Sequence, residues 1–395
     1  MMLKGVLIAL AAVLWMPLVS EVLSLLRRRR VSQVPVVSRQ NPRLLILVPA
    51  HNEQLLIVGC VRSLLRMDYP PTQRRVVVIA DNCNDKTAGL AREEGADVFE
   101  RTEQELPGKP RAIAWALAQI DLTCWDACII VDADSAVAPD FAVAISRLDP
   151  LNDIVFQANI GVLNEYDNWL TRLGGLLSRC RYEITYPLKQ SAGLNCPVMG
   201  NGMGFGTSLL IRDGWRAFSI TEDSELYAIY TEAGVPIRQA MSAYLFSQEP
   251  RSLGQGATQR RRWLAGRIRV IREWAVRLIR APRIGWHQKL DAFVELGLAS
   301  PVLNLLGVLA IVLTALFAVT GRAGLWIAAF AVASLAGIVV TTVIGILRHP
   351  QPWRTATSFL MLPVYAAWRT VVAVATLFTL GDRTWRKTAR TAPQL

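Results

Sequence analysis

Hydrophobic residues in the middle of this chain form short runs, and each run is followed by a polar turn and a stretch with helical spacing. The runs lie at residues 44–48, 75–80, 127–131 and 154–157. Short apolar runs that alternate with helical patterns predict a largely parallel β-sheet with crossover helices. Such sheets bind ligands beyond the carboxyl ends of their strands. We therefore expect an α/β nucleotide-binding domain, here bounded at residues 41–250, with its chemistry directly after the runs.

A much longer apolar run lies near the N-terminus. Residues 5–26 are apolar except for Ser20, Glu21 and Ser24, and about 20 apolar residues suffice to span a bilayer. Four arginines follow at 27–30, whereas a cleaved signal peptide carries its positive charge before the apolar run. Because positive residues stay on the cytoplasmic side, we predict a membrane helix within residues 1–30 that leaves the next domain in the cytoplasm.

A second apolar region occupies residues 293–382, where we predict about three membrane helices. Two spans are expected at 302–319 and 324–347. The third stretch, 359–380, carries a proline and Arg369 in its middle and precedes a basic tail at 383–395. A full span would place that tail outside, against the usual bias. Either the stretch is bent, re-entrant or interfacial, or the tail breaks the rule.

A basic segment, 251–290, joins the α/β domain to these spans. Residues 251–289 contain eleven Lys or Arg and one acidic residue, Glu273. Apolar residues recur in it at helical spacing, which predicts an amphipathic helix on the cytoplasmic membrane surface. The alternative is a helix buried along one side with a solvated basic face. The apolar stripe comprises Leu264, Ile268, Ile271, Ala275 and Leu278.

Composition supports a membrane protein. The 395 residues are 52% hydrophobic, with 43 Lys and Arg against 31 Asp and Glu, a formal net charge of +12. The positive charge clusters beside apolar runs, which favours a membrane surface and argues against a nucleic-acid partner. Six cysteines without a CxxC pair, and three widely separated histidines, indicate neither a zinc site nor a disulfide framework.

Carboxylates gather where the predicted strands end. Glu53 follows the first run, Asp81 and Asp85 follow the second, and Asp132 and Asp134 follow the third. Capping of helix N-termini is an alternative role for carboxylates such as Glu53 and Asp85. The alternating pair at 132 and 134 instead favours a divalent cation bridged to a diphosphate.

An ordered set of motifs connects these residues to a family. The set comprises VPAHNE at 48–53, IADNCND at 79–85, PGKPRAIAWAL at 107–117, DAD at 132–134, TED at 221–223 and QRRRW at 259–263. In this order the motifs resemble glycosyltransferase family 2, in particular its branch with cellulose, chitin and hyaluronan synthases. The resemblance covers residues 41 to about 270. It implies a GT-A-like nucleotide-sugar-binding domain combined with α-helical transmembrane segments.

The resemblance also implies roles for the matched residues. Asp223 would be the general base, and Asp134 with Asp132 would hold Mg²⁺ or Mn²⁺. The nucleotide-sugar contacts would come from Glu53, Asp81, Lys109, Asp132, Gln259 and Arg262. The acceptor contacts would come from Trp263, Glu222, Gly200 and Gly202, although the glycine-rich loop at 199–205 can also be a plain turn.

From these features we expect a metal-dependent, inverting hexosyltransferase of the bacterial inner membrane, with its catalytic domain in the cytoplasm. It would transfer a sugar from a UDP-sugar to a growing polysaccharide or oligosaccharide. One alternative is the addition of a single sugar to a lipid or lipid-linked acceptor, and another is an inactive scaffold subunit. With about four membrane segments, a synthase would work as a homo-oligomer or with partner subunits.

Overall fold

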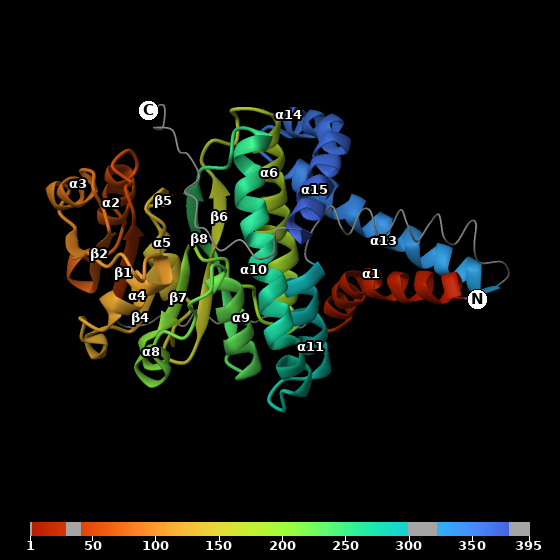
Figure 1. Ribbon diagram of the computed structural model, residues 1–395, viewed down its shortest axis with the longest axis horizontal. Helices are drawn as coiled ribbons and strands as arrows, with labels where there is room; N and C mark the ends of the chain where they lie inside the picture. The colour runs from red at the N-terminus through yellow and green to blue at the C-terminus, as the bar shows by residue number, and fades with distance from the viewer. Residues whose placement is uncertain (1, 29–40, 299–321, 379–395) are drawn as a thin grey trace.

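The computed structural model describes residues 2–28, 41–298 and 322–378, and its centre is an eight-stranded sheet in the order β3-β2-β1-β4-β7-β6-β8-β5 (Figure 1). The four predicted runs are confirmed as strands β1, β2, β4 and β6. The strands are β1 (Leu44–Ala50), β2 (Arg74–Asp81), β3 (Asp97–Arg101), β4 (Ala127–Ile130), β5 (Ser135–Val137), β6 (Val155–Val162), β7 (Met203–Gly206) and β8 (Ile237–Ser247).

The sheet is mixed, so the prediction of a largely parallel sheet holds for only part of it. Strands β3, β2, β1 and β4 are parallel to one another, as are β6 and β8. Strand β7 runs antiparallel between β4 and β6, and β5 runs antiparallel to β8. The sequence did not predict β7 and β5 because each is only three or four residues long, too short to show a strand pattern.

Helices cover both faces of the sheet, because alternate strand residues point to opposite sides. On β1, Leu45 and Leu47 join one core while Leu44 and Ile46 join the other. The helices around these cores are α2 (Ile57–Leu65), α3 (Thr87–Glu93), α4 (Lys109–Leu117), α5 (Phe141–Ser146), α6 (Trp169–Cys180), α7 (Tyr186–Ser191), α8 (Thr207–Asp213), α9 (Glu222–Glu232), α10 (Leu253–Arg280) and α11 (Trp286–Phe293).

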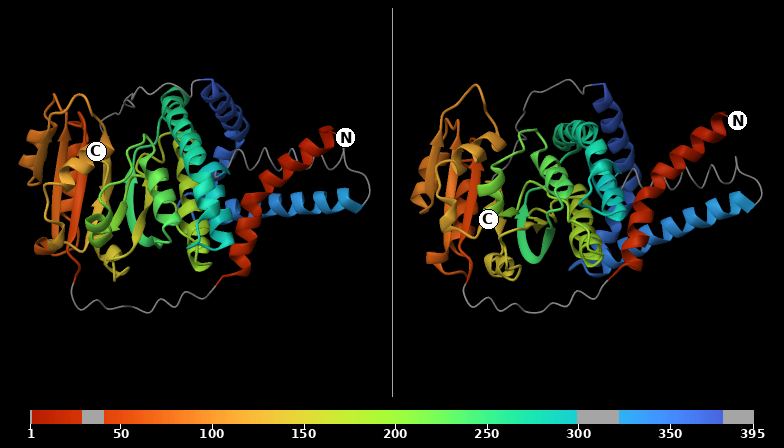
Figure 2. Two further views of the ribbon diagram at one scale, coloured as in Figure 1. Left: turned by 60° about the horizontal axis from the view of Figure 1, so that its bottom comes forward. Right: turned by 90° about the horizontal axis from the view of Figure 1, so that it is seen from below.

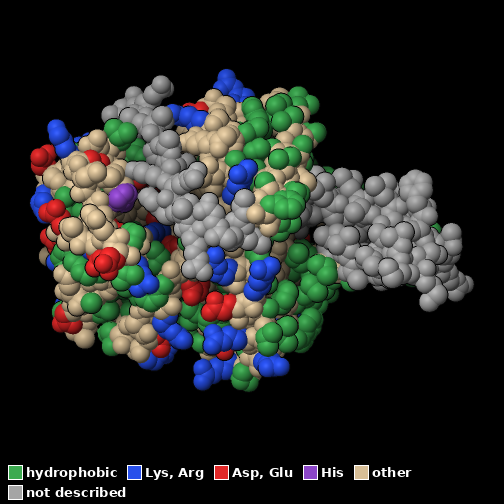
Figure 3. Space-filling view, viewed as in Figure 1, with side chains coloured by type: hydrophobic (Ala, Val, Ile, Leu, Met, Phe, Trp, Pro, Cys, Tyr) green, Lys and Arg blue, Asp and Glu red, His purple; other side chains and the backbone are tan. Residues whose placement is uncertain are grey.

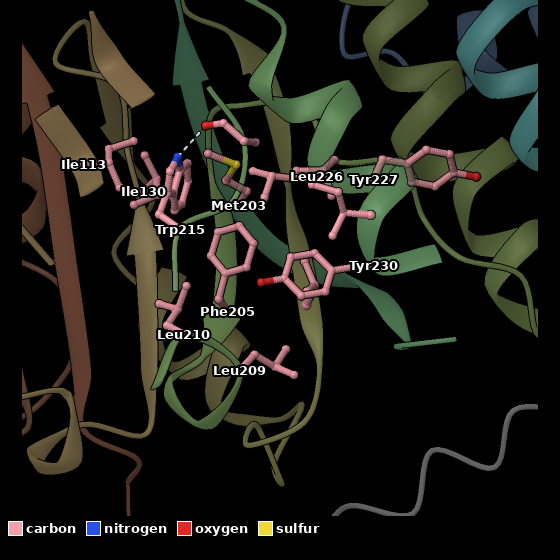
Figure 4. Close-up of a cluster of buried hydrophobic side chains, with 14 of the residues drawn as sticks. Ile113, Ile130, Met203, Phe205, Leu209, Leu210, Trp215, Leu226, Tyr227 and Tyr230 are labelled. Carbon is pink, nitrogen blue, oxygen red and sulfur yellow. Dashed lines mark hydrogen bonds between the residues drawn. The ribbon is translucent and has the colours of Figure 1, made fainter. Parts of the chain in front are cut away.

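The core between the sheet and α9 fixes the position of that helix (Figure 4). The ring of Phe205 on β7 lies 5.7 Å from that of Trp215 and 5.8 Å from that of Tyr230 on α9. The indole of Trp215 donates a hydrogen bond of 2.7 Å to the carbonyl of Ala217. These contacts fix α9, whose first turn carries Glu222, against the sheet.

Helix α10 is a single helix of 28 residues, longer than the pattern suggested. Its buried positions are Gly256, Gly266, Val270, Trp274 and Leu278. Of the predicted apolar stripe, Leu278 is buried and the other residues are half-buried, while two glycines, Val270 and Trp274 form the rest of the deeply buried face.

The remaining helices are the candidate membrane segments. Helices α1 (Met2–Leu26) and α13 (Arg322–Leu347) project from the body on the same side (Figures 1 and 2). Within the described ranges, one helical segment, Pro352–Leu377, is long and apolar enough to cross a membrane, and Trp15–Leu26 and Leu335–Leu347 are shorter apolar helices. The predicted span at 302–319 and the basic tail lie outside the described residues.

The stretch expected at 359–380 consists of α14 (Pro352–Thr357), a 3₁₀ turn and α15 (Leu362–Leu377). Pro363 lies in the first turn of α15, where a proline costs no helical hydrogen bond. Trp368 of α15 packs against Gly256 of α10, so this stretch lies against the α/β body.

Ser20 and Glu21 of the N-terminal run face a buried ionic group. Ser20 donates a hydrogen bond of 2.7 Å to Asp291 of α11, which pairs with Lys189 at 2.8 Å. Glu21 also interacts with Lys189. Buried charges are stabilised only when all their partners are in place, so these contacts attach α1 to the α/β body.

Candidate active site

The turns after β1 and β2 form one side of the candidate site. Asn52 and Asn82 both have left-handed backbones, with φ of 55° and 50°. The Asn52 side chain accepts a 2.9 Å hydrogen bond from the backbone of Asn84, and the backbone N–H of Glu53 donates one of 2.8 Å to Thr87. The two turns are thereby joined, and Glu53 lies beside the turn that follows Asp81, as predicted.

Asp81 is buried at the end of β2, where the sequence placed a nucleotide contact. Its carboxylate forms an ion pair of 2.6 Å with Arg101, the last residue of β3. Its other oxygen accepts a hydrogen bond of 3.2 Å from the backbone N–H of Gly108. Asp81 therefore holds the start of α4, and with it Lys109, in place. Arg101 was not predicted, because a single arginine at a strand end has no sequence signature.

Lys109 is the centre of the site. Its Nζ atom lies 2.6 Å from Asp132 Oδ1, 2.7 Å from the carbonyl oxygen of Gly200 and 3.4 Å from Glu222 Oε1. Burial would lower the pKa of Lys109, but the carboxylates of Asp132 and Glu222 raise it above its ordinary value, so the amine stays charged. Lys109 thus connects the DAD motif, the glycine-rich loop and the TED motif.

The glycine-rich loop is a structural part of the site rather than a plain turn. Gly200 and Gly202 have φ of +75° and +68°, a region that L side chains rarely adopt. Between them, Asn201 accepts a hydrogen bond of 3.0 Å from the backbone of Asp132 and donates one of 2.8 Å to Ser135. Asn201 was missed in the sequence, where only its position between two glycines distinguished it.

Glu222 and Asp223 begin α9 and lie against this loop. A β-carbon at Gly200 would lie 3.6 Å from Asp223 Oδ2 and 3.7 Å from Glu222 Oε1. Burial raises the pKa of Glu222 to about 7, against the opposing effect of Lys109. Burial also raises the pKa of Asp223, which Arg267 opposes. A carboxylate with a raised pKa is a stronger base, as an acceptor hydroxyl requires.

The QRRRW motif lies on α10, which reaches the TED turn through Gly266. A β-carbon there would collide with the side chain of Thr221. Trp263 is 37% exposed, with the guanidinium of Arg260 4.7 Å from its ring centre. The Oε1 atom of Gln259 is buried and has no hydrogen-bond partner within the described chain. The helix therefore brings Gly266, three residues after the motif, against the TED turn, and the Trp263 ring stays partly exposed beside Arg260.

Asp132 and Asp134 fit a divalent cation that is also held by a diphosphate. Within residues 2–28, 41–298 and 322–378, no group of three His, Cys, Asp or Glu side chains forms a metal cage. Mg²⁺ commonly binds to one or two carboxylates and completes its coordination with phosphate oxygens and water. Two carboxylates at the rim therefore suit a metal that arrives with its substrate.

The match to a family model identifies the family of this chain, and curated relatives are similar to the chain. The model of the family described as "Glycosyltransferase like family 2" matches residues 42–266. The probable glycosyltransferase YdaM of Bacillus subtilis is 24% identical over 255 residues, which cover 62% of this chain and 60% of that protein. A beta-monoglucosyldiacylglycerol synthase of Trichormus variabilis is 30% identical over 193 residues, covering 47% of this chain and 40% of that protein. The chain thus matches about half the length of these relatives.

A solved structure shares the fold. It is the mannosyltransferase PcManGT from Pyrobaculum calidifontis in complex with GDP-Man and Mn²⁺. The TM-score is 0.56 at 21% identity, and the match covers 95% of this chain and 99% of that chain. The catalytic fold is thus GT-A-like. Because the family model spans more than half of the 395 residues, and includes all the motifs from the first strand to QRRRW, this chain belongs to glycosyltransferase family 2.

Proposed function

We propose that this chain is a membrane-bound, inverting glycosyltransferase that transfers a sugar from a UDP-sugar to an acceptor at the cytoplasmic membrane surface. The proposal rests chiefly on the contacts that the Lys109 side chain makes. Its amine touches Asp132, on the proposed donor side, and Glu222, the neighbour of the proposed base. The Lys109 cation thereby holds the proposed donor site and the proposed base next to each other.

In the proposed reaction, Asp223 removes the proton of the acceptor hydroxyl as that oxygen attacks the anomeric carbon. One displacement by one base inverts the anomeric centre. The departing diphosphate gains negative charge, which Lys109 and Arg262 would stabilise. Mg²⁺ or Mn²⁺, held by Asp134 with Asp132, would supply further charge stabilisation when bound.

The acceptor is the least determined part of the proposal, and a lipid is the first candidate. Three of the curated relatives are beta-monoglucosyldiacylglycerol synthases. Exposed apolar side chains cover the outer side of the helices next to the catalytic body, close to Lys and Arg side chains (Figure 3). They include Val276 and Ile279 on α10, Trp286 on α11 and Val364, Val371 and Leu377 on α15. Such a surface would admit a lipid acceptor.

Extension of a polysaccharide or oligosaccharide is the second candidate. It is favoured by the QxxRW arrangement of Gln259, Arg262 and Trp263, which resembles the branch of polymer synthases. The exposed indole of Trp263 offers a flat face on which a sugar ring can stack. Such a synthase would need further copies of this chain, or partner subunits, to form a channel.

The test is release of nucleoside diphosphate by the purified full chain in nanodiscs, with several UDP-sugars, Mg²⁺ or Mn²⁺, and diacylglycerol or an oligosaccharide as acceptor. We expect turnover of one donor and its loss in Asp223→Asn. The matched control is Asp213→Asn, an aspartate at the end of α8 that pairs with Arg212. Mass analysis of the product separates a glycolipid from a polymer. Absence of both donor binding and turnover would favour the scaffold alternative.

A further inference from the structure

A cavity that the proposed reaction does not use lies between helix α6 and the carboxyl ends of strands β6 and β8. Its volume is about 360 Å³, within the range of small-molecule sites, roughly 300–1,000 Å³. Strands β4 and β6 are parallel to each other, because each runs antiparallel to β7. The cavity therefore lies at the same edge of the sheet as Asp132, which follows β4.

Two aromatic rings of β8 form one wall of the cavity. A register shift between Ala158 and Asn159 places Phe246 opposite Gly161 of β6. A β-carbon at Gly161 would collide with the ring of Phe246, so the ring lies across the glycine. The rings of Tyr244 and Phe246 are nearly parallel, with 19° between their planes and 6.4 Å between their centres. Both residues are half-buried, and such aromatic faces suit the C–H face of a sugar ring.

The charged side chains of the cavity come from α6 and the segments next to it. Arg179 Nη1 lies 3.1 Å from Glu183 Oε1, and its Nη2 lies 3.9 Å from Glu165 Oε2. The charged lining is thus two carboxylates and one guanidinium, which leaves one net negative charge. This charge disfavours a phosphate group. Carboxylates that accept and a guanidinium that donates hydrogen bonds suit the hydroxyl groups of an uncharged ligand.

Two polar atoms of the lining are buried without a hydrogen-bond partner among the residues that the structure describes. They are the hydroxyl oxygen of Tyr182 and Nε of Arg179. The Tyr182 side chain is well enclosed, since the residue is 3% exposed. Buried polar groups without a partner are uncommon because they lose the hydrogen bonds of water. A ligand with several hydroxyl groups can supply the missing partners.

The glycine-rich loop connects the cavity to the candidate base. A β-carbon at Gly200 of this loop would lie 3.6 Å from Asp223 Oδ2. The carbonyl of Gly202 accepts a hydrogen bond of 2.9 Å from the backbone of Ala158, two residues before the cavity lining begins on β6. Two residues of a strand span roughly 7 Å. A ligand in the cavity would therefore lie beside the position of an acceptor at Asp223.

The cavity also adjoins a candidate membrane helix. A β-carbon at Gly345 of α13 would lie 2.5 Å from the sulfur of Cys180, the last residue of α6. His349, two residues beyond α13, lies with its Nε2 atom 2.6 Å from Glu165 Oε1 of the lining. The headgroup of a lipid beside α13 would therefore be close to the cavity.

We propose that this cavity binds an uncharged sugar unit of the acceptor, so that the molecule to be extended already carries at least one sugar. The inference rests on the proposed function. It favours a glycolipid or an oligosaccharide as acceptor over bare diacylglycerol, because diacylglycerol has no sugar to place between the aromatic and the polar walls.

The test is thermal stabilisation of the full chain by separate probes, in a detergent that has no sugar headgroup and so does not compete. The probes are short-chain glucosyl- and galactosyl-diacylglycerol, cellobiose, lactose, short-chain diacylglycerol, and UDP with Mn²⁺. We expect at least one sugar-bearing probe to stabilise the wild type more than diacylglycerol does. Stabilisation by glycolipids alone would indicate a lipid-linked acceptor, and stabilisation by the disaccharides would indicate a free oligosaccharide.

Tyr182→Phe isolates the unpartnered hydroxyl. It should weaken the apparent affinity for the sugar probe about three- to tenfold, the usual effect of losing one hydrogen bond. Its melting temperature without ligand should stay the same or rise, because the variant loses no hydrogen bond of the free protein. The matched control is Tyr227→Phe on α9, whose hydroxyl is also buried without a partner in the described chain but does not line the cavity.

Phe246→Leu tests the aromatic wall. It should also weaken binding of the sugar probe, since the flat face is lost. Phe99→Leu, a half-buried phenylalanine of β3 outside the cavity, should bind the probe as the wild type does.

The inference is wrong if no sugar-bearing probe stabilises the chain more than diacylglycerol, or if Tyr182→Phe binds the sugar probe as tightly as the wild type. The UDP measurement separates this inference from the proposed function. Tyr182→Phe should keep its stabilisation by UDP with Mn²⁺, and a wild type that binds the sugar probe but not UDP would count against the transferase rather than against the sugar site.

Discussion

Gly266 on α10 lies so close to Thr221 that any β-carbon at position 266 would collide with the threonine side chain. Thr221 immediately precedes Glu222 and Asp223, and Gly266 follows the QRRRW motif by three residues. The contact therefore fixes the distance between the candidate base and the helix that carries Arg262 and Trp263. We therefore expect this packing contact to affect turnover.

Gly266→Ala tests this contact. The added methyl group should force α10 away from α9, which costs about 1–3 kcal/mol for an overpacked position. Turnover should fall because Asp223 and the motif separate. The matched control is Gly254→Ala in the first turn of α10, where a β-carbon meets nothing within 4 Å. Equal activity and equal melting temperatures in the two variants would contradict the role of the contact.

The sequence predicted those parts of the site that depend on strand order. Asp81 and Asp132 follow apolar runs, and parallel strands bring their carboxyl ends to one edge of the sheet. The motif resemblance then connected Lys109 and Asp223 to that edge, although they lie 114 positions apart in sequence. Local pattern and motif order were sufficient for these residues.

The contacts that the sequence did not predict join segments with no shared local pattern. The pairing of Arg101 with Asp81 depends on the register of β3 against β2, and β3 has no continuous apolar run. The buried face of α10 depends on glycines, which contribute nothing to a hydrophobic stripe. Both are decided by tertiary packing, which a single sequence does not display.

Arg101→Met tests the buried pair. Without its counterion the carboxylate of Asp81 would be a buried, uncompensated charge, which typically costs about 3–5 kcal/mol. We expect a lower melting temperature and a weaker affinity for UDP, measured by thermal shift and calorimetry. Arg92→Met should have little effect, because its pair with Glu100 is exposed on the surface. A variant at 101 with wild-type stability and UDP affinity would show that Asp81 needs no counterion.

Lys109→Met tests the central cation. The loss of its amine leaves Asp132 and Glu222 without their shared partner. We expect turnover to fall about 10²–10³-fold, the usual effect of removing one group that stabilises a developing charge. Lys86→Met, an exposed lysine before α3, is the control. If turnover survives in Lys109→Met, another group must neutralise the leaving diphosphate.

Asp134→Ala tests the metal site. We expect turnover by the wild type to stop in EDTA and to return with Mn²⁺ or Mg²⁺, because two carboxylates alone hold a hard cation weakly. In Asp134→Ala the metal concentration for half-maximal turnover should rise at least about tenfold. Asp140→Ala, an exposed aspartate before α5, should keep the wild-type requirement. Turnover that persists in EDTA would remove the metal from the proposal.

Because Glu222 and Asp223 must be ionised, the pH profile of kcat/KM should begin to fall on its acid side close to neutral pH. The base works only when it is ionised, and burial raises the pKa of Asp223 and raises that of Glu222 to about 7. As pH falls, protonation of this pair should therefore reduce kcat/KM at a higher pH than for an ordinary aspartate, whose pKa is about 3.9. Because the two carboxylates titrate together, Glu222→Gln removes a negative neighbour and should move the limb to lower pH. Glu232→Gln, at the other end of α9, should leave the limb in place, and an unmoved limb in Glu222→Gln would assign the titration to another group.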